Sequence, residues 1–77
     1  MPEIKVYSTP TCTYCQLAKQ FFTENNVNYE EIDVSADNEK LQEMVELSGQ
    51  MGVPVMKIGE QVVVGFDEGK VKELLNM

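Results

Sequence analysis

The stretch Val6-Tyr7-Ser8-Thr9-Pro10-Thr11-Cys12-Thr13-Tyr14-Cys15 decides the fold, because a strand pattern ends in it and a helix pattern begins in it. Upstream, apolar and polar residues alternate from Ile4, which predicts a strand. Downstream, apolar residues recur at helical spacing and predict a helix from about Thr13 to about Glu24. Cys12 and Cys15 are the only cysteines in the chain. They therefore lie where the predicted strand gives way to the predicted helix.

Composition limits the classes of function. The chain has 77 residues, of which 43% are hydrophobic, and this suits one small domain over residues 1–77 with a modest core. Its net charge of −7 argues against binding to nucleic acid or to anionic membranes, which attract cationic proteins. The first residues lack the apolar run of a signal peptide, and no stretch is long enough to cross a membrane. We therefore expect a cytoplasmic protein.

The rest of the chain continues the alternation of strands and helices. The expected elements follow in chain order: a strand with Tyr29, Ile32 and Val34; a helix from about 35–38 to Gly49; strands Val53–Ile58, with Pro54 inside, and Gln61–Val64, joined by a turn at 59–60; and a helix from about Asp67. The first β-α-β unit should be parallel, and the two later strands should form a hairpin. The predicted architecture is α/β in the order β-α-β-α-β-β-α, a four-stranded mixed sheet flanked by three helices.

The two cysteines predict redox chemistry. At the start of a helix, free backbone N–H groups and the helix dipole stabilise a thiolate on Cys12, and the thiolate is the attacking species in disulfide exchange. Cys15 follows one helical turn later on the same face, about 5–6 Å away between Cα atoms, which a disulfide tolerates. Cys15 should face the interior and be the less exposed. We therefore predict an enzyme, a thiol–disulfide oxidoreductase in which Cys12 attacks and Cys15 resolves.

Other interpretations of the pair remain open. A disulfide within four residues constrains the unfolded chain very little, so the pair is a poor structural staple. Structural zinc requires four nitrogen or sulfur ligands, and this chain supplies two thiols and no His. The main alternative is therefore a dimer that bridges a metal ion or an iron–sulfur cluster through Cys12. An acidic interaction domain with a vestigial dithiol is a third hypothesis.

Three segments of the chain resemble glutaredoxins. Thr11-Cys12-Thr13-Tyr14-Cys15 is similar to their active-site segment, in which Pro-Tyr commonly separates the cysteines. Gly52-Val53-Pro54 resembles their Thr-Val-Pro element, and Gly65-Phe66-Asp67-Glu68 resembles their Gly-Gly-x-Asp turn. The segments follow in the family's order, and the resemblance covers essentially the whole chain. It implies a monomer with the thioredoxin-like fold and no bound cofactor or metal. It also implies that the monomer reduces protein disulfides or glutathione mixed disulfides, with ribonucleotide reductase or peroxide-reducing enzymes among the candidate partners.

The resemblance also implies a set of substrate-binding or glutathione-binding residues, namely Thr11, Tyr14, Val53, Pro54, Gly65, Phe66 and Asp67. In the family, the proline that corresponds to Pro54 is cis, and the residue before it offers its backbone to an extended substrate. The residues alone are equally consistent with a proline at a strand start or edge. The N–H groups of residues 65–68 would receive a glutathione carboxylate, although Asp67 also suits an ordinary helix start. Tyr14 either contacts substrate or is an ordinary exposed aromatic residue.

Departures from the family's pattern leave two electron donors open. Thr9 stands where many glutaredoxins carry a Lys that meets a glutathione carboxylate, and Gln16 stands where many carry a basic residue or His. The pair Gly65-Phe66 is similar to that of NrdH-type redoxins, which are often reduced by thioredoxin reductase. Tyr14, by contrast, is more typical of glutaredoxins. The sequence therefore predicts either glutathione or thioredoxin reductase as the reductant.

Overall fold

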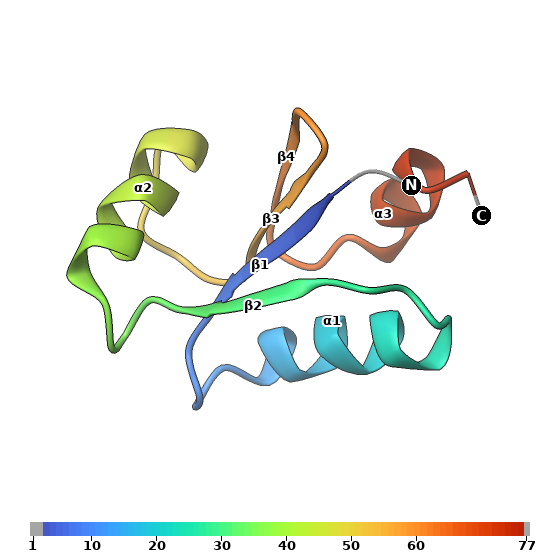
Figure 1. The fold of residues 1–77 in the computed structure, drawn as a ribbon, viewed down its shortest axis with the longest axis horizontal. Helices are drawn as coiled ribbons and strands as arrows, with labels where there is room; N and C mark the ends of the chain where they lie inside the picture. Colours follow the sequence, from blue (N-terminus) through green and yellow to red (C-terminus); the bar gives the residue numbers. More distant parts are fainter. Residues whose placement is uncertain (1–2, 77) are drawn as a thin grey trace.

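The computed structural model describes residues 3–76 as a mixed sheet of four strands with three helices (Figure 1). The elements are β1 (Ile4–Ser8), α1 (Thr13–Glu24), β2 (Glu30–Asp33), α2 (Asn38–Ser48), β3 (Val55–Ile58), β4 (Gln61–Val64) and α3 (Glu68–Leu74). The strands lie in the order β2-β1-β3-β4. β1 pairs in parallel with β2 and antiparallel with β3, and β4 is antiparallel to β3. The predicted order of elements and the mixed sheet are confirmed.

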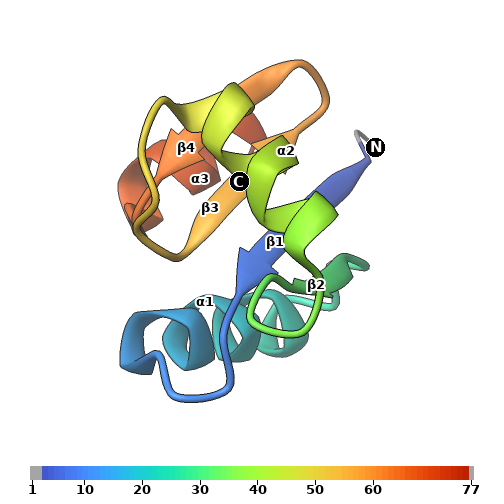
Figure 2. The ribbon, with the colours of Figure 1, turned by 90° about the vertical axis from the view of Figure 1, so that its left-hand side faces the viewer.

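The sheet separates two apolar clusters, because successive strand residues point to opposite faces. The first cluster lies under α1 and α3 and consists of Ile4, Val6, Ala18, Phe21, Phe22, Val27, Met56, Ile58, Val63 and Val71. The second lies under α2 and consists of Tyr7, Ile32, Val34, Met44 and Val55. Figures 1 and 2 show α2 on one side of the sheet and α1 and α3 on the other. Helices therefore cover both faces, as predicted.

Side-chain caps define where α2 and α3 begin. The Asp37 carboxylate accepts hydrogen bonds from the backbone N–H groups of Glu39 and Lys40, and the Asp67 carboxylate accepts one from the N–H of Lys70. Such caps satisfy N–H groups that have no partner within the helix. α2 ends at Gly49, whose φ of 75° is the left-handed conformation that glycine adopts most easily. The predicted helix starts near Asp37 and Asp67 and the stop at Gly49 are confirmed.

The third strand is shorter than predicted. We expected Val53–Ile58 with Pro54 inside, but the strand begins at Val55. Proline has no N–H to donate to a sheet, so Pro54 cannot serve as an ordinary paired residue. Its carbonyl oxygen instead accepts a hydrogen bond from the N–H of Gly65 at 2.8 Å, and the Val53–Pro54 peptide bond is cis. The second strand is also shorter than its predicted span, and Tyr29 and Val34 flank it.

A buried tyrosine connects β1 with α2. The side chain of Tyr7 is fully buried, and its hydroxyl donates a hydrogen bond to Oε1 of Glu43 at 2.8 Å. Burial, the hydrogen bond and the Glu43 charge raise the pKa of Tyr7 well above its usual value. In turn, the hydrogen bond from Tyr7 lowers the pKa of the Glu43 carboxyl. The pair satisfies the one polar atom of Tyr7 inside an otherwise apolar cluster.

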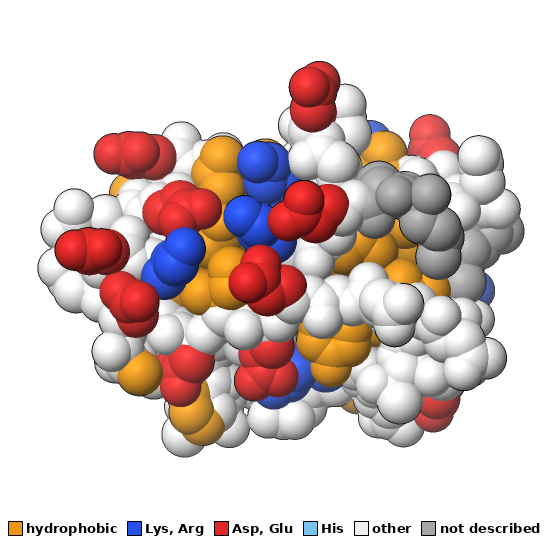
Figure 3. Space-filling model, viewed as in Figure 1, with side chains coloured by type: hydrophobic (Ala, Val, Ile, Leu, Met, Phe, Trp, Pro, Cys, Tyr) orange, Lys and Arg blue, Asp and Glu red, His pale blue; other side chains and the backbone are white. Residues whose placement is uncertain are grey.

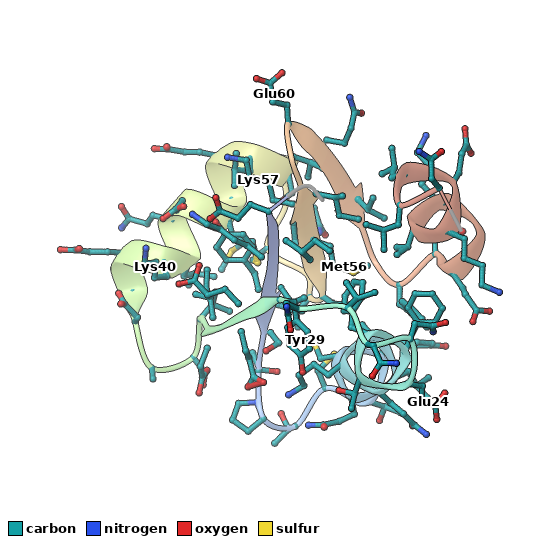
Figure 4. All side chains as sticks on the ribbon, turned by 45° about the vertical axis from the view of Figure 1, so that its right-hand side comes forward. Glu24, Tyr29, Lys40, Met56, Lys57 and Glu60 are labelled. Atoms are coloured by element: carbon teal, nitrogen blue, oxygen red, sulfur yellow. The ribbon has the colours of Figure 1, made fainter. Side chains whose placement is uncertain are left out.

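The surface is acidic but mixed. Figure 3 shows Asp and Glu side chains interspersed with lysines on the face that includes α2. In Figure 4, Glu60 projects from the tip of the β3–β4 hairpin, whereas Met56 on β3 points into the interior, where it is fully buried. Within residues 3–76, each helix is too short or too polar to cross a membrane.

Candidate active site

Cys12 is the N-cap residue of α1. Its backbone is extended, with φ −87° and ψ 116°, and its Sγ accepts a hydrogen bond from the backbone N–H of Cys15 at 3.2 Å. Both cysteines are free thiols; Cys12 is partly exposed, whereas Cys15 is fully buried. The predicted position of Cys12 at the helix start and the lower exposure of Cys15 are confirmed. An N–H group directed at Sγ stabilises negative charge on that sulfur.

The loop before β3 completes the surroundings of Cys12. The Cys12 thiol donates a hydrogen bond to the carbonyl oxygen of Val53, with 3.7 Å between sulfur and oxygen. The next residue, Pro54, is buried and is bonded through its carbonyl oxygen to Gly65 at the end of β4. Three segments that are distant in the sequence therefore meet at the dithiol. They are the three that the resemblance selected.

The environment of Cys15 makes its thiol less acidic than an ordinary cysteine. Burial raises the pKa of Cys15 to about 11, and the hydrogen bond and charge of Cys12 act in the same direction. A backbone hydrogen bond from Thr9 and the positive charge of Lys19 lower this pKa, but their effects are smaller. Cys15 is therefore a neutral thiol in the reduced protein at neutral pH. Only Cys12 combines exposure with hydrogen-bond support for a thiolate.

Exposed apolar side chains lie close in the chain to these residues. The large hydrophobic residues that are most exposed are Tyr14 (64%), Leu17 (43%), Met51 (68%) and Val64 (51%). Each lies within two positions of Cys12, Cys15, Val53 or Gly65. Tyr14 was predicted to be a site residue, whereas the exposure of Leu17, Met51 and Val64 was not predicted. Their sequence patterns are those of ordinary core positions, and only the packing reveals that they remain exposed.

The remaining predicted residues have contacts of a structural kind. Phe66 is half-buried, and its ring packs against that of Phe21 with 5.8 Å between centroids. Asp67 caps α3, and Thr11 is exposed in the loop that precedes Cys12. Gly65 adopts φ 78° and joins β4 to this segment. Contact of these residues with a substrate stays a prediction.

The described residues offer few ligands for a metal ion within one chain. Across residues 3–76, the structure contains no group of three or more His, Cys, Asp or Glu side chains that are close enough together to hold one. The dithiol supplies two ligands within one chain, and structural zinc requires four. A site within one chain therefore lacks ligands among the described residues, and the alternative of a dimer that shares a metal ion or cluster through Cys12 stays a hypothesis.

Comparisons with known proteins identify the family. The family model described as Glutaredoxin matches residues 4–63. The chain belongs to the glutaredoxin family. It is 38% identical over 72 residues to an uncharacterized glutaredoxin-like 8.6 kDa protein of the rubredoxin operon of Clostridium pasteurianum, covering 94% of this chain and 96% of that protein. It is therefore a thiol–disulfide oxidoreductase.

Solved structures agree with this glutaredoxin assignment. The crystal structure of a glutaredoxin from Archaeoglobus fulgidus superposes with a TM-score of 0.89 at 28% identity, covering 100% of this chain and 89% of that one. The NrdH-redoxin of Escherichia coli superposes with a TM-score of 0.82 over 94% of this chain and 93% of that one. At 24% identity, the second likeness supports the fold alone. The glutaredoxin chain thus has the thioredoxin-like fold that the family resemblance implied.

Proposed function

We propose that this glutaredoxin reduces protein disulfides and glutathione mixed disulfides by a two-cysteine mechanism. One observation carries the proposal. Cys12 is partly exposed and its Sγ accepts a hydrogen bond from the Cys15 N–H at 3.2 Å, whereas the Cys15 side chain is fully buried. This asymmetry suits one attacking thiol and one resolving thiol.

The chemistry proceeds in two exchanges. The Cys12 thiolate attacks one sulfur of the substrate disulfide, which forms a mixed disulfide and releases the other substrate sulfur as a thiolate. Cys15 then loses its proton to water and attacks the Cys12 sulfur. The Cys12–Cys15 disulfide forms, and the second substrate sulfur leaves with the electron pair of the broken bond. Two electrons have passed from the dithiol to the substrate, and an external donor restores the dithiol.

Backbone groups next to Cys12 are well placed to hold the substrate. The Val53 carbonyl oxygen lies 3.7 Å from Cys12 Sγ, so an extended segment bound along Val53 would place its sulfur near the attacking thiol. We assign Pro54 to the support of this segment and Thr11 and Tyr14 to its flanks. Residues 65–67 are assigned to a glutathione moiety, because Gly65 is bonded to Pro54 beside the dithiol.

Two electron donors fit this protein, and a coupled assay separates them. Glutathione is the reductant of glutaredoxins, whereas the Escherichia coli NrdH-redoxin has a thioredoxin-like activity profile. Thr9 is neutral where many glutaredoxins carry a Lys that meets a glutathione carboxylate, and Gln16 is neutral where many carry a basic residue or His. NADPH oxidation is followed with a disulfide substrate and either thioredoxin reductase or glutathione with glutathione reductase. The system that turns over identifies the donor.

Two substitutions test the mechanism itself. Cys12→Ser should abolish reduction of every disulfide substrate, because the attacking sulfur is lost. Cys15→Ser should leave a mixed disulfide at Cys12, which intact-protein mass spectrometry detects as an adduct. Disulfide reduction by the Cys12→Ser protein at the unmodified rate would refute the proposal.

A further inference from the structure

A partly buried lysine lies one helical turn beyond the resolving cysteine. Lys19 is four residues after Cys15 on α1, a spacing that places both side chains on the same face of the helix. Only 15% of the Lys19 side chain is exposed, and its Nζ lies 3.3 Å from Oε2 of Glu31 on β2. Lysine ordinarily extends its ammonium group into water. Here the ammonium group is instead held between the helix and the edge of the sheet.

The alternation of β2 explains how this cation is held. Ile32 belongs to the cluster under α2, so its neighbours Glu31 and Asp33 point to the opposite face, which α1 covers. Glu31 forms the ion pair with Lys19. Asp33 already accepts hydrogen bonds from Ser35, which lower the pKa of its carboxyl, and the Lys19 charge contributes in the same direction. Both carboxylates therefore lie on the face of the sheet where the Lys19 ammonium group is held.

Other lysines that form ion pairs are more exposed than Lys19. The Lys5 side chain is 26% exposed, and its ammonium group lies 3.9 Å from Glu3, of which 77% is exposed. In the pairs Lys40–Glu43 and Lys72–Glu68, each side chain is 39–55% exposed, so water and salt screen the charges. The lower exposure of Lys19 means that its field is screened less. It is also the lysine whose charge acts on Cys15.

The electrostatic balance at Cys15 changes during the reaction. In the reduced protein, burial makes the largest contribution to the raised pKa of Cys15, and Cys12 raises this pKa further through its hydrogen bond and its charge. Once Cys12 is bonded to a substrate sulfur, it can no longer be a thiol or a thiolate, so both of its effects disappear. Burial still raises the pKa of Cys15 in the mixed disulfide, and the backbone hydrogen bond from Thr9 and the charge of Lys19 continue to oppose it. The charge of Lys19 then acts on Cys15 without the opposing effects of Cys12.

We propose that Lys19 is a positioning residue for the resolving step: its ammonium group, held by Glu31, stabilises the Cys15 thiolate that attacks the mixed disulfide at Cys12. This inference rests on the proposed function, since it requires Cys15 to resolve the mixed disulfide. In this step the Cys15 proton passes to water, the Cys12–Cys15 bond forms, and the substrate sulfur leaves as a thiolate. Lys19 keeps its proton throughout and acts only through its charge.

The test separates the two exchanges in a single turnover. The reduced protein is mixed with one equivalent of dithiobis(nitrobenzoate), whose two coloured thiolates report attack by Cys12 and then resolution by Cys15. Lys19→Gln should leave the first release unchanged and slow the second about three- to tenfold at neutral pH, the size expected for a partly screened charge one turn away. Because the Cys15 thiolate is harder to form in Lys19→Gln, the rate of the second release in this variant should rise at a higher pH than in the parent protein.

Matched variants distinguish the effect of losing the Lys19 charge from an effect of the substitution on folding. Lys19→Arg keeps the charge and should resolve within about twofold of the parent protein, since a guanidinium group also pairs with Glu31. Lys70→Gln removes the same charge from an exposed position on α3 and should change neither release. Lys19→Met keeps the apolar stem and should behave as Lys19→Gln, so it replaces that variant if the latter is unstable. In a Cys12→Ser background, the alkylation rate of Cys15 against pH provides a second readout.

The two proposals fail in different ways. If Lys19→Gln or Lys19→Met resolves at the parental rate with the parental pH profile, the role of Lys19 is wrong. An equal slowing in Lys70→Gln or Lys19→Arg would also overturn it. If the parent protein shows no second release, or if Cys15→Ser still shows one, the proposed function itself is wrong.

Discussion

The sulfur of Cys12 lies 3.7 Å from the carbonyl oxygen of Val53, a residue 41 positions further along the chain. This contact joins the N-terminus of α1 to the loop before β3. It places a backbone acceptor beside the attacking thiol, and the Cys15 N–H approaches the same sulfur at 3.2 Å. The reactive atom is therefore surrounded by backbone groups, whose positions depend on the fold more than on any neighbouring side chain.

The two thiols should differ strongly in reactivity. Burial makes the Cys15 thiol inaccessible. Its pKa of about 11 keeps it neutral at neutral pH. With a small alkylating reagent at neutral pH, we expect Cys12 to be modified first and Cys15 roughly 100-fold more slowly or not at all. Intact-protein mass spectrometry against time measures both rates. Cys12→Ser serves as the control and should show only the slow reaction, whereas equal rates in the two single-cysteine variants would contradict the assignment.

Two glycines on either side of the start of α3 should respond in opposite ways to alanine. Gly65 adopts φ 78°, where an L side chain is strained, although an added Cβ would meet no atom within 4 Å. Gly65→Ala should therefore destabilise the protein by about 1 kcal/mol. Gly69 lies within α3, where its added Cβ would make only an ordinary contact with Asp67. Gly69→Ala should stabilise by about 0.5–1 kcal/mol. Urea unfolding measures the stability of both variants. A loss of stability in both would show that crowding by the added methyl group, not backbone conformation, determines the effect of alanine.

The Tyr7–Glu43 hydrogen bond should contribute a stability that depends on pH. Tyr7→Phe should lower the free energy of unfolding by about 1–1.5 kcal/mol at neutral pH, since it removes a bond to a charged acceptor. The folded-state pKa of Glu43 is lowered, so its contribution is present above its unfolded pKa of about 4.3 and is lost as pH falls through the folded value. The difference between parent and variant should therefore narrow in acid.

Urea unfolding at neutral and acidic pH measures that difference. Tyr29→Phe is the matched control, because it removes a hydroxyl that forms no side-chain hydrogen bond with residues 3–76. A difference that is constant with pH for Tyr7→Phe would show that Glu43 is not the partner that matters.

Phe66 should contribute to stability through its contact with Phe21. The two rings lie 5.8 Å apart between centroids, and Phe66 is only half-buried. Phe66→Ala should therefore cost about 1–2 kcal/mol, less than a fully buried phenylalanine, whereas Phe66→Leu should retain most of the contact. Thermal or urea unfolding distinguishes the variants. An unchanged stability in Phe66→Ala would instead favour a role for the ring in binding alone.

Much of the fold could be predicted because its signals are local. The helical spacing of α1, the Asp37 cap and the Gly49 stop depend on residues within one or two turns, and the structure confirms each. The start of β3 was predicted wrongly, because the hydrophobic pattern extends back through Pro54 to Val53 although proline cannot pair there. Pairing, unlike periodicity, depends on which strand lies alongside.

The sequence by itself determined that two cysteines stand at a helix start in a β-α-β-α-β-β-α chain, because hydrophobic periodicity, capping and the spacing of the thiols are properties of neighbouring residues. Only the tertiary structure decided what surrounds those thiols. Burial makes Cys15 neutral, Val53 reaches Cys12 from another element, and the register of β2 brings Glu31 to Lys19. Each of these depends on residues that are distant in the chain. Only strand pairing and helix packing bring them together.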